Sequence, residues 1–115
     1  MPFIDAKLSI KLDENQKNDL QEVLANAVST AFIKPKSYIM TNIEDSKSLY
    51  MGGNEVKNGA YIAVYSLGTN ISKSACQSAS QTICSYLTSK YGFNGANIYI
   101  TYHPVELWSW NGSMF

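Results

Sequence analysis

The chain has 115 residues, the size of one compact domain. Nine lysines balance nine acidic residues, and arginine is absent. Nucleic-acid-binding proteins rely on a basic patch and on arginine, so the composition argues against that class. The sequence has no apolar run of about 18 residues, which excludes a membrane-spanning helix. Charged residues make up only 16% of the chain, which is consistent with a surface partly covered in an oligomer.

The first half of the chain predicts a strand, a helix and a second strand. Residues 3–10 alternate between apolar and polar side chains, as expected of a strand with one buried face. Asp13 and Gln16 form a capping-box pattern. The apolar residues that follow recur at helical spacing and predict a helix over residues 14–33, which ends before a proline. Residues 37–43 predict the second strand.

The second half repeats this order. Residues 60–67 are apolar, aromatic and uncharged, which is typical of a buried central strand. Ser72 is a plausible cap for a helix over residues 73–90 that stops at a glycine. Residues 97–102 predict the last strand, and Pro104 limits its extension.

This element order predicts an α+β fold in a single domain over residues 1–115. Two β-α-β units with right-handed crossovers give a four-stranded mixed sheet with two helices on one face. The chain has no third helix for the other face. We therefore expect this face to be covered by oligomerisation.

Pro2 directly follows the initiator methionine, and a proline there permits removal of Met1. The new terminus is then a secondary amine. An apolar pocket disfavours its charged form, so its pKa moves toward neutrality and suits a general base. Many ordinary proteins also begin with Met-Pro, so these two residues alone do not identify a catalytic terminus.

Other residues carry alternatives that the sequence leaves open. Lys34 lies at the end of the first predicted helix, where it either caps the helix dipole or binds a carboxylate. Backbone N–H groups near Leu67 could hold an oxyanion. Tyr99 and Thr101 share one face of the last strand. Three aromatic residues of the tail either line an apolar site or simply pack: Trp108, Trp110 and Phe115.

Metal and cofactor chemistry has no support in the sequence. There are two cysteines, one histidine and no metal-ligand spacing, and no Gly-rich phosphate loop is present. Cys76 and Cys84 lie eight residues apart on one predicted helix, about 12 Å along its axis. That is too far for a disulfide, and we expect two buried thiols. His103 has no evident partner, which favours a surface or structural role.

Several short motifs occur in an informative order. They are Met1-Pro2-Phe3, Lys34-Pro35, Met51-Gly52-Gly53-Asn54-Glu55, Ser66-Leu67-Gly68 and the closing Trp110-Asn111-Gly112-Ser113-Met114-Phe115. The closing segment is the most specific of them. Together they resemble the macrophage migration inhibitory factor family of the tautomerase superfamily, and the resemblance covers essentially the whole chain.

The resemblance implies a homotrimer whose three sheets form an inner barrel wrapped by six helices. It implies cofactor-free keto–enol interconversion of small aromatic 2-oxo acids such as phenylpyruvate, and of dopachrome-like substrates, with Pro2 as the base. Lys34 and the Leu67 backbone N–H would bind the carboxylate. Tyr99 would come from a neighbouring subunit, and Trp110 and Phe115 would wall the pocket between subunits.

Four positions depart from the family pattern. Thr101 stands where the family usually has Asn, which is a longer polar group that contacts substrate. Trp108 replaces a common Val and either narrows the pocket or stacks on an aromatic substrate. Ile33 replaces the Gly before the Lys-Pro pair, which predicts a differently shaped helix end. Residues 59–62 replace a Cys-x-x-Cys motif, so thiol–disulfide activity is not expected.

Three functions remain open from the sequence. The first is a tautomerase, and the second is a secreted, cytokine-like ligand of a cell-surface receptor with little or no catalysis. The third is a non-catalytic regulatory domain that binds a small molecule. Pro2 and Lys34 favour the first over the third. The expected location is cytoplasmic because no signal peptide is present, and the family resemblance adds secretion without a signal peptide.

Overall fold

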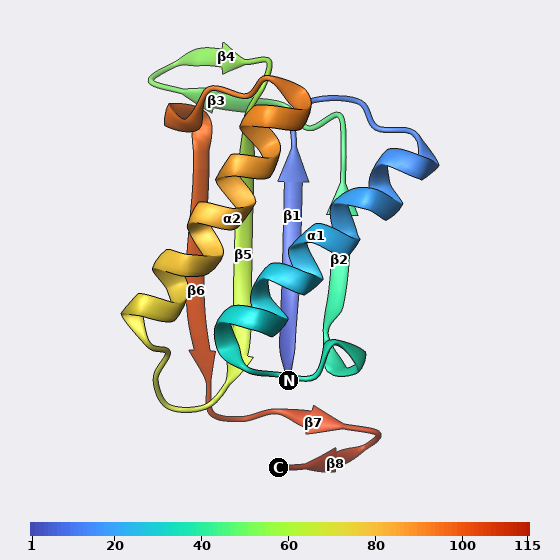
Figure 1. Ribbon diagram of the computed structural model, residues 1–115, viewed down its shortest axis with the longest axis vertical. Coiled ribbons are helices and arrows are strands. Elements are labelled where there is room, and N and C mark those ends of the chain that lie inside the picture. The colour runs from blue at the N-terminus through green and yellow to red at the C-terminus, as the bar shows by residue number, and fades with distance from the viewer.

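The computed structural model describes residues 1–115, and Figure 1 shows two helices packed over one sheet. The helices are α1 (Glu14–Phe32) and α2 (Lys73–Tyr91). The four strands of the sheet lie in the order β2-β1-β5-β6. Their bounds are Pro2–Leu8 for β1, Met40–Glu44 for β2, Ala60–Leu67 for β5 and Ile98–Val105 for β6.

The strand pairing confirms the predicted architecture. β1 pairs with β2 in parallel, and β5 pairs with β6 in parallel. The two central strands, β1 and β5, run antiparallel. The chain therefore consists of two β-α-β units set against each other in opposite directions, as expected of the α+β fold.

Both ends of α1 follow from local sequence. Asp13 Oδ1 accepts a hydrogen bond from the Gln16 backbone N–H (2.8 Å), and Gln16 Oε1 accepts one from the Asp13 N–H (2.9 Å). Ile33 ends the helix in the left-handed region, with φ 53°. Ile33 thus adopts the conformation that glycine favours at a helix C-terminus. That the end is shaped differently from that of the family stays a prediction. A β-branched residue is strained there.

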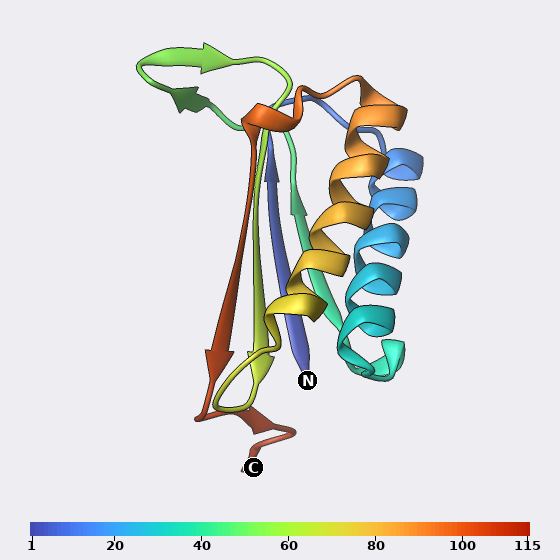
Figure 2. The same cartoon turned by 60° about the vertical axis from the view of Figure 1, so that its left-hand side comes forward.

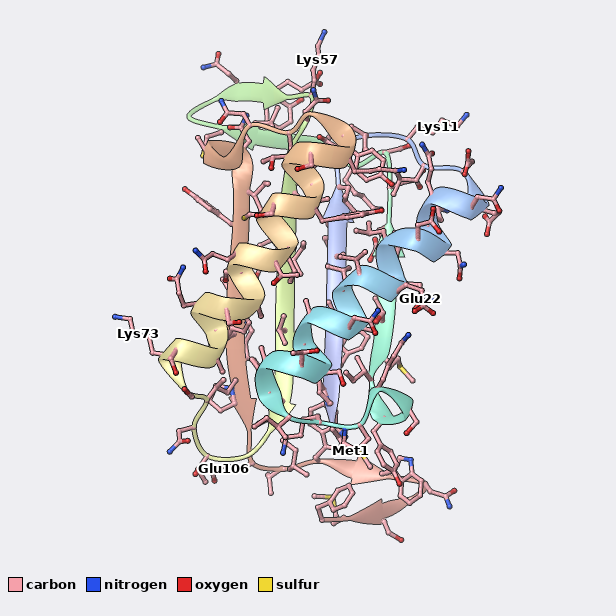
Figure 3. The ribbon with its side chains drawn as sticks, in the orientation of Figure 1. Met1, Lys11, Glu22, Lys57, Lys73 and Glu106 are labelled. Atoms are coloured by element: carbon pink, nitrogen blue, oxygen red, sulfur yellow. The ribbon has the colours of Figure 1, made fainter.

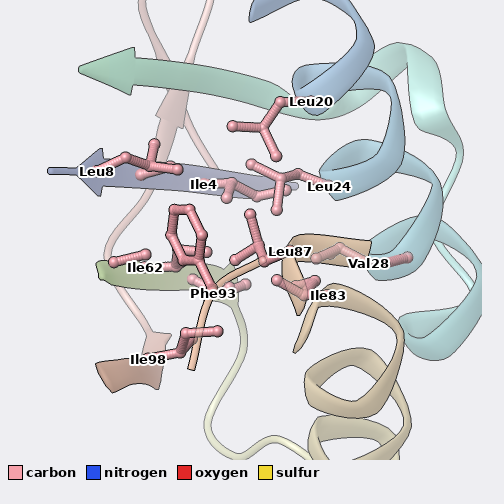
Figure 4. Close-up of a cluster of buried hydrophobic side chains, with 14 of the residues drawn as sticks. Ile4, Leu8, Leu20, Leu24, Val28, Ile62, Ile83, Leu87, Phe93 and Ile98 are labelled. Atoms are coloured by element: carbon pink, nitrogen blue, oxygen red, sulfur yellow. The ribbon is translucent and has the colours of Figure 1, made fainter. Parts of the chain in front are cut away.

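The hydrophobic core lies between the helices and the sheet (Figure 4). Alternate residues of β1 point into it, while α1 and α2 contribute leucine, isoleucine and valine from their inner faces. Each such fully buried aliphatic side chain stabilises the fold by about 1.5–3 kcal/mol. The largest of these core residues are Ile4, Leu8, Leu20, Leu24, Val28, Ile62, Ile83 and Leu87.

No helix covers the opposite face of the sheet, as Figure 2 shows in an oblique view. On β1 this face carries Phe3, Asp5 and Lys7, which alternate with the buried core residues. Lys7 Nζ donates to Asp5 Oδ2 (2.7 Å), and Asn42 Nδ2 donates to Asp5 Oδ1 (2.9 Å). The helix-free face is therefore mixed in character, with a polar network beside aromatic side chains.

Three predicted strands have different bounds in the structure. The first, predicted over residues 3–10, is β1, which ends at Leu8. A 3₁₀ turn, η1 (Lys36–Tyr38), takes up the start of the predicted strand 37–43, and β2 begins only at Met40. The turn forms because the Tyr38 N–H donates to the Pro35 carbonyl (3.1 Å). The last strand passes through Pro104 rather than stopping before it. It is an edge strand paired on one side only, so the missing proline N–H is tolerated.

Two small hairpins project from opposite ends of the sheet (Figures 1 and 2). One consists of β3 (Leu49–Met51) and β4 (Asn54–Val56), and the other of β7 (Ser109–Trp110) and β8 (Ser113–Met114). A second 3₁₀ turn, η2 (Gly95–Asn97), precedes β6. Neither long helix has the length and apolar character needed to cross a membrane.

Candidate active site

Pro2 is the first residue of β1, and its side chain is fully buried. The antiparallel register sets Pro2 beside Ser66 and Phe3 beside Tyr65. A cavity of about 650 Å³ lies against this end of the sheet. Most of its lining is hydrophobic, and the aromatic residues in it are Phe3, Tyr38, Tyr65, Trp108 and Trp110.

Several elements bring these aromatic side chains together. Tyr38 comes from η1 and meets Trp110 edge to face, with ring centroids 6.3 Å apart. Phe3 and Tyr65 stack across the two central strands at 6.1 Å. Trp110 comes from the β7–β8 hairpin, which lies below the end of β1 that Met1 marks in Figure 3. Such an aromatic cavity suits a flat, apolar ligand.

Met1 occupies one edge of this cavity. Its carbonyl oxygen accepts a hydrogen bond from the Leu67 backbone N–H, with 3.2 Å between nitrogen and oxygen. Burial and the nearby positive charge of Lys34 lower the pKa of the Met1 amino group. An amine at this end of the chain is therefore easier to deprotonate than a free terminus in water.

Lys34 and Leu67 line a second cavity of about 630 Å³, between the C-terminal end of α1 and the N-terminal end of α2. No residue lines both cavities. Pro2 lines the aromatic cavity, and its pairing partner Ser66 lines the second one. The predicted base and the predicted carboxylate-binding groups thus line two separate cavities at the same end of the β1–β5 strand pair.

Tyr99 lies far from Pro2 within the chain. It pairs with Tyr61, which in turn pairs with Lys7 on β1, five residues from Pro2 and so about 17 Å along the strand. Tyr99 is 61% exposed, and its hydroxyl lies 3.7 Å from Met51 Sδ near the β3–β4 hairpin. One copy of the chain therefore does not bring Tyr99 to the Pro2 cavity.

The family model for macrophage migration inhibitory factor (MIF) matches residues 1–115. The chain belongs to this family. Comparison with curated protein sequences finds no match.

Solved structures of MIF proteins share the fold. Leishmania major MIF2 is 25% identical with a TM-score of 0.89, covering 100% of this chain and 97% of that one. The MIF homologue of Prochlorococcus marinus is 28% identical with a TM-score of 0.84, covering 98% of both chains. The MIF-like protein of Entamoeba histolytica is 27% identical with a TM-score of 0.85, covering 99% of this chain and 98% of that one.

Two further site residues expected from the MIF resemblance lie outside the aromatic cavity in this single chain. Phe115 is 63% exposed, although its N–H donates to the Trp108 carbonyl (3.1 Å). Thr101 is tied to its own sheet, because its hydroxyl lies 2.9 Å from the Tyr61 hydroxyl and 2.8 Å from His103 Nε2.

His103 and the cysteines also differ from expectation. His103 has a partner in Thr101 and stacks on Tyr65, with centroids 4.7 Å apart. This contact favours the structural role over the surface role. Cys76 and Cys84 are both free and lie on α2 as predicted, but they are half-buried rather than buried. Nowhere do three or more metal-ligating side chains gather.

Several residues that line the aromatic cavity have no site role that the sequence predicts. Phe3 and Tyr65 become neighbours only through the β1–β5 register, and the 3₁₀ turn presents Tyr38. Phe3 was the one with a usable signal, since it follows Pro2 on a strand whose other face is buried. No sequence pattern predicts the hydrogen bond from the Leu67 N–H to the Met1 carbonyl.

Proposed function

We propose that this MIF family protein is a cofactor-free keto–enol tautomerase that acts on phenylpyruvate-like and dopachrome-like substrates, with Pro2 as the catalytic base. One observation carries the proposal: Pro2 lines an aromatic cavity, while its strand partner Ser66 lines a cavity that holds Lys34 and Leu67. An aromatic acid needs both environments.

The proposed base requires removal of Met1, because the lone pair of an amide nitrogen is delocalised into the carbonyl group and does not accept a proton near neutral pH. Removal turns the Pro2 nitrogen into a secondary amine in the same surroundings. Burial and Lys34 already lower the pKa of the Met1 amine, which lies one residue further out. The same two effects favour an unprotonated Pro2 amine near neutral pH, as a general base requires.

In the proposed reaction the aromatic ring enters the Pro2 cavity and the carboxylate binds the Lys34 ammonium. Loss of Met1 also frees the Leu67 N–H as a second carboxylate donor. The Pro2 nitrogen takes a proton from the carbon between the ring and the carbonyl, and the C–H electron pair forms the enol double bond. The carbonyl oxygen then takes the proton back from Pro2, so no other reactant is needed.

We also propose that the active assembly is a homotrimer. The helix-free sheet face, the unpaired outer edges of β2 and β6, and the exposed Tyr99 support it. A neighbouring copy is the source from which Tyr99 could reach the Pro2 cavity, since its own copy keeps it about 17 Å away. The receptor-directed role and the cellular location stay predictions.

The test is phenylpyruvate tautomerisation by protein whose intact mass confirms loss of Met1. We expect turnover well above the buffer rate, and its loss in Pro2→Gly. Pro104→Ala is the matched control, because this proline lies on an edge strand and lines neither large cavity. A processed, trimeric protein without turnover would overturn the proposed enzyme activity.

A further inference from the structure

The cavity between the C-terminal end of α1 and the N-terminal end of α2 is lined by hydrogen-bond donors and has no acidic side chain. Its lining includes the ammonium-bearing Lys34, the amide of Asn70 and a group of hydroxyl side chains, but no Asp or Glu. The proposed reaction uses only Lys34 and Leu67 from this set. The hydroxyl-bearing residues of the lining are Thr30, Ser66, Ser72, Ser74 and Ser78.

Ser66 is the unusual member of this set. It is only 4% exposed, and it is the one buried polar residue of the chain. Its side chain lies on the helix-facing side of β5, in line with the apolar Ile62 and Val64. None of the side-chain hydrogen bonds in the chain involves its hydroxyl, which borders the cavity. The fully enclosed side-chain oxygens without a partner are Thr41 Oγ1 and Tyr91 OH. The Ser66 oxygen therefore stays open to the cavity that it lines, where it is free to donate to a ligand.

The N-terminal end of α2 faces the same cavity. Ser72 caps the helix by accepting the Ala75 N–H (3.3 Å), and its hydroxyl lies 2.9 Å from that of Ser74. The first turn contains no acidic residue. The 19-residue helix therefore presents the positive end of its dipole without a built-in anion to neutralise it.

Lys34 offsets the one unfavourable feature of the cavity. The C-terminal carbonyls of α1 lie on the other side, and their partial negative charge would repel an anion. Lys34 follows this helix end and forms no ion pair with any carboxylate of the chain. Its ammonium attracts both the partial negative charge of the α1 carbonyls and an anion bound on the α2 side of the cavity.

We propose that this cavity binds a small tetrahedral oxyanion of the phosphate or sulfate class. Donors reach it from three elements: Lys34 after α1, Ser66 on β5, and the Ser72–Ser74 turn of α2. Donors from three directions suit a tetrahedral group with several acceptor oxygens better than a planar carboxylate. Binding requires neither removal of Met1 nor the chemistry of Pro2, and it controls access to Lys34.

The test is a titration of the full-length protein with inorganic phosphate, followed by backbone amide NMR shifts, in Met1-retaining and in processed protein. We expect saturable shifts at Ser72 to Ala75 and at Lys34. Ser66→Ala should weaken binding about tenfold, the loss of one hydrogen bond to a charged group. Ser74→Asp places a negative charge in the first helical turn, which the helix tolerates, and should weaken binding at least about tenfold.

The matched control is Ser85→Asp, which makes the same charge change at an exposed position of α2 outside the cavity. This control should bind phosphate like the parent protein. Equal weakening by Ser74→Asp and Ser85→Asp, or shifts spread over all lysines without saturation, would overturn the site. If Ser66→Ala fails to fold, the Ser74→Asp and Ser85→Asp pair decides. Because no turnover is measured, failure here is separate from failure of the tautomerase proposal.

Discussion

The Leu67 backbone N–H donates its hydrogen bond to the carbonyl oxygen of Met1, 3.2 Å away. The residue expected to be removed therefore occupies a donor that the proposed reaction needs. A single cleavage would create the catalytic amine at Pro2 and release the Leu67 N–H for the substrate. Processing and carboxylate binding are linked by this one contact.

Protein that retains Met1 should neither turn over phenylpyruvate nor engage its carboxylate at Leu67. Expression with the methionine aminopeptidase inhibited gives this form, and intact mass identifies it. Addition of phenylpyruvate should shift the Leu67 amide resonance only in processed protein. Equal shifts in both forms would show that the Met1 carbonyl does not compete with substrate.

Replacement of Lys34 should weaken substrate binding without unfolding the protein. Lys34 forms no ion pair, so Lys34→Met leaves no carboxylate without a partner. We expect KM for phenylpyruvate to rise at least about tenfold, because a hydrogen bond to a charged group is lost. Lys36→Met, which removes a solvent-exposed pair with Glu22, is the control and should leave KM near that of the parent.

Thr101 should act through its own sheet rather than through the substrate. Thr101→Val removes the contacts to the Tyr61 hydroxyl and to His103 while keeping the shape of the side chain. We expect a loss of about 1–3 kcal/mol in unfolding free energy, from two hydrogen bonds, with KM nearly unchanged. Urea denaturation and steady-state kinetics on one preparation test this, and a raised KM at unchanged stability would restore the substrate contact.

Asp5 should give the protein an acid-sensitive component of stability. Burial acts to raise the pKa of Asp5, but hydrogen bonds from Lys7 and Asn42 outweigh it and lower this pKa overall. The contribution is therefore complete above the ordinary Asp pKa of about 3.9 and is lost as pH falls through the lower folded-state value. Urea midpoints measured below about pH 4 should fall less steeply with decreasing pH in Asp5→Asn than in the parent.

Glu106→Gln is the control for that measurement, because Glu106 lies on the surface and forms no ion pair. Its urea midpoint should fall with decreasing pH as steeply as that of the parent. If Asp5→Asn and the parent lost stability in parallel, the Asp5 network would carry no acid-sensitive stability.

Substitution of Ile33, at the C-terminal end of α1, should stabilise the protein. Ile33 is 88% exposed and has φ 53°, so its side chain gains little from burial while its backbone is strained. Ile33→Gly removes the strain and should raise the unfolding free energy by about 1 kcal/mol. Ile33→Ala keeps a Cβ in the left-handed region and should gain less. A thermal or urea melt of the three proteins gives the order directly.

Local rules were sufficient for much of the fold. All four ends of the two long helices lie within one residue of the prediction. The Asp13–Gln16 capping box, the Ser72 cap and the Gly92 stop are the local signals for three of them. Strand β5 occupies residues 60–67 as predicted, since its uncharged, β-branched sequence fits only a central strand. These features depend on residues close in sequence.

The errors arise where tertiary context decides. The 3₁₀ turn before β2 competes with an extended conformation of similar local preference. Pro104 is tolerated because β6 lies at the sheet edge, which the sequence does not reveal. The aromatic cavity depends on the β1–β5 register and on the turn that presents Tyr38, so its wall could not be assembled from motifs alone.

The two hairpins lie at opposite ends of the sheet, so the two ends of the molecule are not equivalent. The end with Pro2 and the β7–β8 hairpin differs in chemistry from the end with Tyr99 and the β3–β4 hairpin. Contacts that join one end of a copy to the other end of the next copy are heterologous. Each copy then contributes one kind of end to one neighbour and the other kind of end to the other neighbour. The rotation between successive copies then decides whether such contacts close into a ring, and a closed ring repeats the same composite site once per copy.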